Sequence, residues 1–334
     1  MDARIIENME PFNEIYFKSC FYNSLFPVIN HFSSDINRIL TNEIIVYDLE
    51  HGKDDSSIRI KYIPVLGQED LINNLGLDVE MKESCDIIDD AGISISEGRP
   101  VIIWIDSFYE PIRADTYLKM HNPHTLLLYG FDRKEKVFNI IEHKHRENLT
   151  YKKELIGYND VIEAYGSYKD NFKALGDAIS YYSFDGNPYS GMHDSKNEPE
   201  KKKADFLNSF YEKRTVIFDG LAHLESFIKY YKKTVMDEGL LKNNVESLLV
   251  SINNIINFKK VESYRFKRIF SESHYLSGMA REIAECWEVL RIDVAKYLFF
   301  SIYKQDLFNK NVEMSARILQ AEYNFYKELM ACRV

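Results

Sequence analysis

The chain has 334 residues, 45% of them hydrophobic, and a formal net charge of −10 at pH 7. This length allows two domains with real cores, while the acidic balance disfavours nucleic acid as a partner. No run approaches the ~18 apolar residues of a membrane span. The first thirteen residues do not resemble a signal peptide, and four cysteines without a pairing pattern indicate a reducing compartment. We therefore expect a cytoplasmic protein without a membrane partner.

The first predicted element is an amphipathic helix near Cys20. Its apolar residues recur at spacings of three and four and share one face: Phe17, Phe21, Leu25, Val28, Ile29 and Phe32. Pro27 fits if the regular helix begins at Asn23 or Ser24, or if a first turn holding Cys20 bends at Pro27. At a helix N-terminus, free backbone N–H groups and the helix dipole lower the pKa of a thiol. Cys20 is therefore either a reactive nucleophile or a buried, inert cysteine.

The next segment predicts strands and short helices. Residues 44–47 are apolar throughout and residues 58–63 alternate, as strands do, with a polar turn between them. Residues 67–97 are interpreted as short helices, with Ser84 as a cap and Gly98 as a stop. A buried strand over 101–105 follows Pro100. Asp106 at its end is predicted either to face the active cleft or to cap the turn at 108–109.

A hairpin follows at residues 124–142. Two apolar runs are joined by the charged turn 132–135, which predicts two antiparallel strands and then a helical piece near 159–166. His124 begins the first strand and Glu142 ends the second, so the two side chains are expected to lie side by side. A carboxylate in that position can orient an imidazole and stabilise it when protonated, which is the third role of a catalytic triad.

The composition changes between residues 181 and 205, where loop-forming residues dominate. We predict a catalytic domain over 1–180, a linker over 181–204 and a helical bundle domain over 205–334. Candidate helices are about 200–236, 240–270, 272–304 and 311–331, and their short links favour an antiparallel bundle. The helical domain also offers a surface through which the chain could form oligomers.

Three segments together resemble a known family. They are residues 19–24 around Cys20, residues 98–111 with the strand that ends at Asp106, and residues 121–132 with His121 and His124. The chain resembles, over about residues 12–165, the papain-like family named after the N-terminal domain of butirosin biosynthesis protein H, a relative of the double-glycine leader peptidases. The resemblance implies an α+β, papain-like cysteine-protease-type domain. It also implies an acyltransferase that takes a thioester from a carrier protein and passes the acyl group to an amine or peptide acceptor in natural-product biosynthesis.

The predicted catalytic residues are Cys20 as nucleophile, His124 as base and Glu142 as the group that orients His124. His124 is favoured over His121 as the base because a strand fixes a side chain better than the loop before Pro123 does. Residues expected to contact the oxyanion or substrate are Asn13, Glu14, Asn23, Asp106 and His121. The papain-like pattern has Gln at the position of Glu14, and its third catalytic residue is usually Asp followed by Pro, where this chain has Glu142 and His143.

Three other interpretations stay open from the sequence. A hydrolase, either a peptidase or a thioesterase, would use the same residues, and a non-catalytic binding protein would explain Glu14 in place of Gln. A metal site could combine His121 and His124 with Glu142, His143 and His145. Strand alternation, however, predicts that His143 faces away from Glu142, so we expect neither a metal nor another cofactor.

Overall fold

The computed structural model describes the chain except for residues 50–56, 146–149, 173–178, 187–197, 271–274 and 333–334. The chain forms two compact units: Met1–Arg38 with Gln68–His193, and Ile39–Gly67 with Asp194–Val334. We call them the sheet unit and the helical unit. The predicted α+β class is confirmed, since an antiparallel sheet is followed by a helical region. No described helix is long and apolar enough to cross a membrane.

The predicted domain boundaries are wrong at two places. Residues 39–67, expected in the catalytic domain, belong to the helical unit. Residues 181–186, expected in the linker, form a strand that pairs with two strands of the sheet. Residues 187–197 of the predicted linker lie outside the described residues. The segment 39–67 contains a hairpin with an apolar strand, and that strand has to pack against an apolar surface. The order of residues along the chain does not determine which unit provides that surface.

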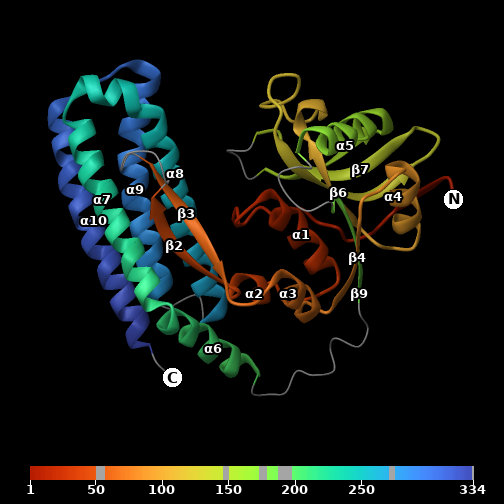
Figure 1. The fold of residues 1–334 in the computed structure, drawn as a ribbon, viewed down its shortest axis with the longest axis horizontal. Helices are drawn as coiled ribbons and strands as arrows, with labels where there is room; N and C mark the ends of the chain where they lie inside the picture. The colour runs from red at the N-terminus through yellow and green to blue at the C-terminus, as the bar shows by residue number, and fades with distance from the viewer. Residues whose placement is uncertain (50–56, 146–149, 173–178, 187–197, 271–274, 333–334) are drawn as a thin grey trace. The chain divides into compact units, whose positions relative to one another are not determined.

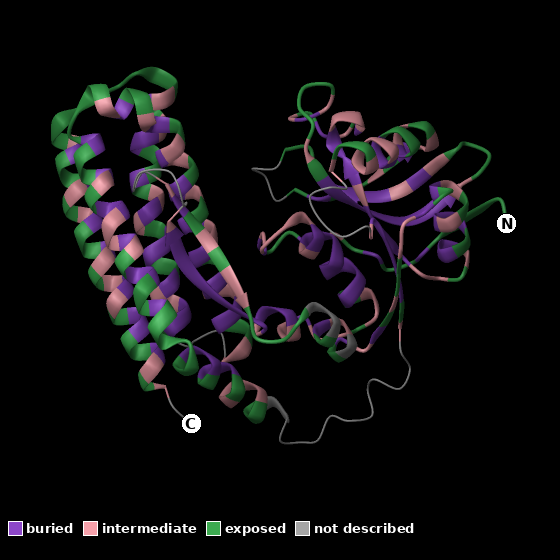
Figure 2. Cartoon of the chain, viewed as in Figure 1, coloured by how far each residue is buried: buried purple, intermediate pink, exposed green. Residues whose placement is uncertain are grey.

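The sheet unit contains a seven-stranded antiparallel sheet (Figure 1). Six strands are ordered β4, β9, β5, β6, β7, β8. The seventh, β1, pairs with the C-terminal end of β6. The central strands β5 and β6 are almost entirely buried (Figure 2), which matches their continuous apolar sequences. The bounds are β1 Ala3–Ile5, β4 Leu77–Lys82, β5 Val101–Asp106, β6 Pro123–Asp132, β7 Val137–Glu142, β8 Lys152–Gly157 and β9 Tyr181–Gly186.

Helices of the sheet unit pack against these strands. α1 contacts β5 and β6, and α5 contacts β5, β8 and the short helix η1. α1 begins at Cys20, so the alternative start at Asn23 or Ser24 is wrong, and Pro27 lies inside the helix. The bounds are α1 Cys20–His31, α3 Gln68–Asn74, α4 Ile87–Ser96, η1 Ser107–Tyr109 and α5 Tyr158–Phe172, while α2 Asn37–Leu40 spans the division between the units.

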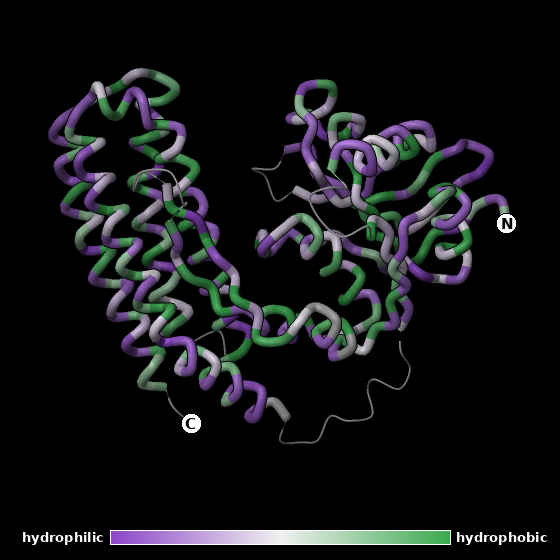
Figure 3. The backbone as a smooth tube through the Cα atoms, viewed as in Figure 1, coloured by the Kyte–Doolittle hydropathy of each residue, from purple (hydrophilic) through white to green (hydrophobic). Residues whose placement is uncertain are grey.

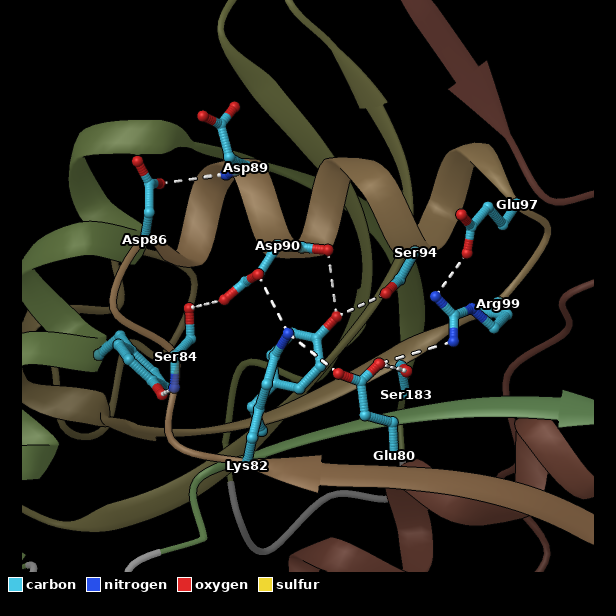
Figure 4. Close-up of polar contacts among 12 residues, drawn as sticks. Glu80, Lys82, Ser84, Asp86, Asp89, Asp90, Ser94, Glu97, Arg99 and Ser183 are labelled. Carbon is cyan, nitrogen blue, oxygen red and sulfur yellow. Dashed lines mark hydrogen bonds and ion pairs between the residues drawn. The ribbon is translucent and has the colours of Figure 1, made fainter.

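The edge strand β4 was not predicted, because its sequence is dominated by charged residues. These charged residues form ion pairs (Figure 4): Lys82 Nζ lies 3.0 Å from Asp90 Oδ1 and 3.1 Å from Glu80 Oε1. Charged side chains on an edge strand discourage pairing with other chains. Ser84 was predicted to cap α4, and this prediction is wrong. The cap is Asp86, whose Oδ1 accepts a hydrogen bond from Asp89 N at 3.1 Å. The stop at Gly98 is confirmed by its φ of 85°.

The helical unit is a bundle that carries the hairpin β2–β3. Apolar and polar residues alternate around its helices (Figure 3), as amphipathic helices require. The hairpin packs against α7 and α8, and a Cβ at Gly220 of α7 would lie 3.0 Å from Tyr47 O. The predicted helix 200–236 breaks at Lys213. The bounds are β2 Glu43–Leu49, β3 Ile58–Pro64, α6 Glu198–Glu212, α7 Arg214–Val235, α8 Glu238–Ile269, α9 Tyr275–Phe300 and α10 Gln305–Ala331.

Candidate active site

A tight turn sets the position of Cys20. Lys18 has a left-handed φ of 58°, and Ser19 N donates to Phe17 O at 2.6 Å. The chain then enters α1 with Cys20 as its first residue. Left-handed backbone costs an L-residue about 1–2 kcal/mol and persists where the surrounding structure fixes it. The turn therefore presents the thiol at the helix N-terminus, as the sequence predicted.

Asn23 holds this turn in place. Its Oδ1 accepts from Phe17 N at 3.0 Å and its Nδ2 donates to Ile15 O at 2.9 Å, and the side chain is buried. The amide thus connects the segment before Cys20 to the first turn of α1. These contacts give Asn23 a structural role, and they do not support the predicted contact with an oxyanion or substrate.

His124 and Glu142 lie together, as the hairpin predicted. His124 Nε2 is 3.0 Å from Glu142 Oε2, and both side chains are buried. With Nε2 on the carboxylate, Nδ1 is left for the thiol of Cys20, to which His124 is hydrogen-bonded. Thr125 also hydrogen-bonds the sulfur, through its backbone and its hydroxyl. The three predicted catalytic side chains therefore form one series of contacts, from Cys20 to His124 to Glu142.

The charges of Cys20, His124 and Glu142 stabilise one another. Burial raises the pKa of the Cys20 thiol, but hydrogen bonds from His124 and Thr125 and the charge of His124 outweigh it, so the pKa is lowered. Burial lowers the pKa of His124, but the Glu142 charge and the thiolate raise it to about 10. The pKa of Glu142 is lowered, since the charge of His124 overcomes burial. At neutral pH the site therefore holds an imidazolium and a carboxylate, and the lowered pKa of Cys20 favours its thiolate form.

Glu142 has further neighbours that the sequence did not reveal. His143 N donates to its Oε1 at 2.7 Å, and Arg113 Nη1 lies 4.0 Å from the same oxygen. Glu110 is fully buried beside Glu142, and neither of its oxygens accepts a hydrogen bond from a described residue. Burial and the Glu142 charge raise the pKa of Glu110 well above its usual range. Glu110 therefore carries its proton, and Glu142 is the ionised member of the two carboxyls.

Glu110 and Arg113 could not have been assigned to the site from the sequence. Both follow η1 in a segment without regular structure, and no spacing relates that segment to the hairpin. Pro111 next to Glu110 was the only local signal of a turn. Their proximity to Glu142 is a tertiary property.

The same region tests the metal interpretation. His143 was predicted to face away from Glu142, and this is wrong: its Nδ1 lies 2.7 Å from Glu142 Oε1, because β7 ends at Glu142 and strand alternation ends with it. His124, Glu142 and His143 offer ligand atoms within 4.8 Å of one another. Ligands around Zn²⁺ at about 2.0–2.2 Å lie more than about 3 Å apart. The distances of 3.0 and 2.7 Å here fit a directly hydrogen-bonded network better.

Two other residues predicted to contact the oxyanion are Asn13 and Glu14. The side-chain amide of Asn13 is occupied by the backbone of Tyr151, with Nδ2 donating to its O at 3.0 Å and Oδ1 accepting from its N at 2.8 Å. Glu14 is exposed and makes no hydrogen bond or ion pair with a described residue. Neither contact with an oxyanion is supported. The amides of Cys20 and Phe21 have no acceptor among the described residues, because Ser19 provides no side-chain cap, and they are the available donors.

Asp106 and His121 form a second acid–imidazole pair. Asp106 is fully buried and accepts from Ser167 Oγ at 2.7 Å, from Phe108 N at 3.1 Å and from Asn122 N at 3.2 Å. Its Oδ2 lies 2.6 Å from His121 Nδ1. The predicted cap at residues 108–109 is therefore confirmed, and the carboxylate also holds a histidine that is half exposed.

An aromatic stack connects the two acid–imidazole pairs. Trp104 of β5 stacks on Phe21, which follows Cys20, with ring centroids 6.5 Å apart. Trp104 also stacks on Tyr168 of α5, with ring centroids 5.7 Å apart. Burial and the negative charge of Cys20 raise the pKa of Tyr168, which places this phenol near the thiolate. The stack presents partly exposed aromatic surface beside the nucleophile.

No family model and no curated protein matches this chain. The chemistry of the site therefore has to be inferred from its geometry.

Proposed function

We propose that the protein is a cysteine-dependent acyltransferase that works through an acyl-enzyme thioester on Cys20. The observation that supports this best is the hydrogen-bonded chain from Cys20 through His124 to Glu142, with a lowered thiol pKa and a histidine pKa raised to about 10. A thiolate beside an imidazolium is the reactive form of a nucleophilic cysteine. A solely structural cysteine needs neither partner.

The first half-reaction follows from these contacts. The Cys20 thiolate attacks the carbonyl of a thioester and forms the new C–S bond. The leaving thiolate takes the proton of His124 Nδ1, and the acyl group remains on Cys20. Glu142 holds His124 through Nε2 during both states, and the free amides at the start of α1 stabilise the oxyanion. The balance of atoms requires no cofactor.

The proposed substrate class combines the site with the family resemblance. The aromatic surface of Phe21, Trp104 and Tyr168 suits an apolar acyl group beside the nucleophile. The papain-like assignment and a carrier-protein thioester as donor belong to this proposal, since they derive from the three segments that resemble the butirosin biosynthesis family. A peptidase or thioesterase is the alternative that uses the same acyl-enzyme, with water as acceptor.

Intact-protein mass spectrometry tests the proposal. Incubation with a short acyl thioester, such as an acyl-pantetheine, should add one acyl mass to the wild-type protein. Cys20→Ser and His124→Ala should show no adduct, whereas His121→Ala should still form it. Discharge by added amines with formation of an amide supports the transferase, and discharge by water alone supports the hydrolase. Absence of any adduct at Cys20 would overturn both and leave a non-catalytic binding protein.

A further inference from the structure

The pair Asp106 and His121 has the features of a second reactive group rather than of a structural contact. The buried carboxylate of Asp106 accepts four hydrogen bonds, and the one from His121 Nδ1 is the shortest, at 2.6 Å. The imidazole stacks on Phe108 with ring centroids 4.3 Å apart and an angle of 10° between the planes. The ring is therefore fixed on one edge and on one face, while about half of its side chain remains exposed.

The hydrogen bond also selects the tautomer. An ionised carboxylate only accepts, so a neutral His121 carries its proton on Nδ1 and has a lone pair on Nε2. The pKa of Asp106 is lowered, since hydrogen bonds from His121 and Ser167 and from two backbone amides outweigh the effect of burial. An Nε2 lone pair on a fixed ring can accept a proton from an amine, a hydroxyl or a water molecule.

His121 and His124 are arranged in opposite ways. Glu142 occupies Nε2 of His124 and leaves Nδ1 for the thiol, whereas Asp106 occupies Nδ1 of His121 and leaves Nε2 free. One imidazole is thus oriented toward the nucleophile of the protein. The other is oriented to receive a nucleophile from outside.

Both pairs lie at the same end of the strands β5 and β6. Ile105 pairs with His124, and the next pair along is Asp106 with Pro123. The helix α5 links the two pairs: Ser167 donates to Asp106, and Tyr168, the next residue, stacks on Trp104, which stacks on Phe21 beside Cys20. The two pairs therefore occupy consecutive register positions at one end of the sheet, which is the placement an acceptor needs in order to contact both.

We propose that His121 is the base that binds and deprotonates the acyl acceptor, a primary amine. This inference rests on the proposed acyl-enzyme. The amine nitrogen bonds to the thioester carbonyl carbon, its proton passes to His121 Nε2, and the C–S bond breaks to release the amide and the Cys20 thiolate. His121 then returns its proton to solvent, and His124 regains one from solvent.

The experiment separates the two half-reactions. Acyl-enzyme formed with acyl-pantetheine is freed of donor and mixed with a primary amine, and loss of the adduct mass is followed in time. We expect His121→Ala to acylate at the wild-type rate but to discharge about 10²–10⁴-fold more slowly, the usual contribution of a general base. Normal acylation also shows that the variant is folded.

Two further variants make the test specific. His121→Gln keeps a hydrogen-bond acceptor but cannot take a proton, so it should bind amine with little change in KM and discharge as slowly as His121→Ala. His223→Ala removes a histidine of α7 in the helical unit, which takes no part in either pair, so it should discharge at nearly the wild-type rate. Discharge of His121→Gln or His121→Ala at the wild-type rate would overturn the role of His121 alone. Failure of the wild-type protein to acylate would instead overturn the proposed function, and this role with it.

Discussion

Each unit of the molecule contains a buried group of charges, and the two groups differ in whether they include a reactive residue. In the helical unit, Lys259 Nζ lies 2.6 Å from Glu262 and 2.7 Å from Glu322, and Arg265 lies 3.2 Å from Glu262. All four side chains are fully buried, and Tyr47 and Tyr326 hydrogen-bond the two carboxylates. The charges come from α8 and α10, and Tyr47 connects them to the hairpin.

The charges of the sheet unit are arranged for a different purpose. Glu142 lies between His124, His143 and Arg113, and through His124 it acts on Cys20, a residue that is partly exposed. Glu110 beside it accepts no hydrogen bond from a described residue. A buried group without a partner lowers stability, so this arrangement is tolerated where reactivity requires it. The comparison indicates that the helical-unit charges connect elements, whereas those of the sheet unit tune a nucleophile.

The largest expected effect is on the reactivity of Cys20. Iodoacetamide near pH 7 should modify Cys20 before Cys85, Cys286 and Cys332. Glu142→Gln removes the charge that keeps His124 protonated, so the thiolate is lost and alkylation of Cys20 should slow about tenfold or more. Peptide mass spectrometry measures each site.

Two internal controls accompany this measurement. Cys85 is exposed and should keep its rate in the variant. Glu262→Gln, in the charge group of the helical unit, should leave the rate at Cys20 unchanged. Equal alkylation of all four cysteines in the wild-type protein would contradict the thiolate and remove the distinction between the two charge groups.

The second effect is on stability and concerns Lys259. Lys259→Met leaves Glu262 and Glu322 buried without their shared cation, which should cost about 3–5 kcal/mol of unfolding free energy. Urea denaturation followed by circular dichroism measures it. Lys296→Met is the matched control, since Lys296 is half exposed and 3.1 Å from Asp293, and its loss should cost less than about 1 kcal/mol. If Lys259→Met and Lys296→Met lost the same unfolding free energy, the buried charges around Lys259 would not be what connects the hairpin to the helices.

The smallest effect is a dependence of stability on pH that comes from Glu110. Its folded pKa is raised, so above the ordinary value near 4.3 folding must retain a proton that the unfolded chain releases. Stability is therefore lost as pH rises, by up to about 1.4 kcal/mol per pH unit. Glu110→Gln resembles the protonated acid and avoids this loss.

We therefore expect Glu110→Gln to be more stable than the wild-type protein, by an amount that grows between pH 5 and pH 7. Urea titrations of both proteins at the two pH values give the difference. A difference that stays constant or shrinks would show that Glu110 is ionised in the folded protein.

The sequence by itself determined the local parts of this structure. Continuous apolar runs specify the buried strands β5 and β6, and a charged turn between two such runs specifies the hairpin β6–β7. Within one hairpin the spacing of residues fixes which side chains are neighbours, and for this reason His124 and Glu142 could be paired in advance. The helix at Cys20 and the main helices of the bundle follow from periodicity in the same way.

Tertiary structure decided everything that depends on surfaces distant in sequence. Local patterns do not say which unit covers an apolar hairpin, and β2–β3 joins helices that lie more than a hundred residues later. The edge strand β4 has a polar sequence and becomes a strand only because β9 pairs with it. Glu110 and Arg113 reach Glu142, and Asp106 orients His121, through packing between separate elements. Such contacts depend on how elements pack in three dimensions, which the spacing of residues along one element does not determine.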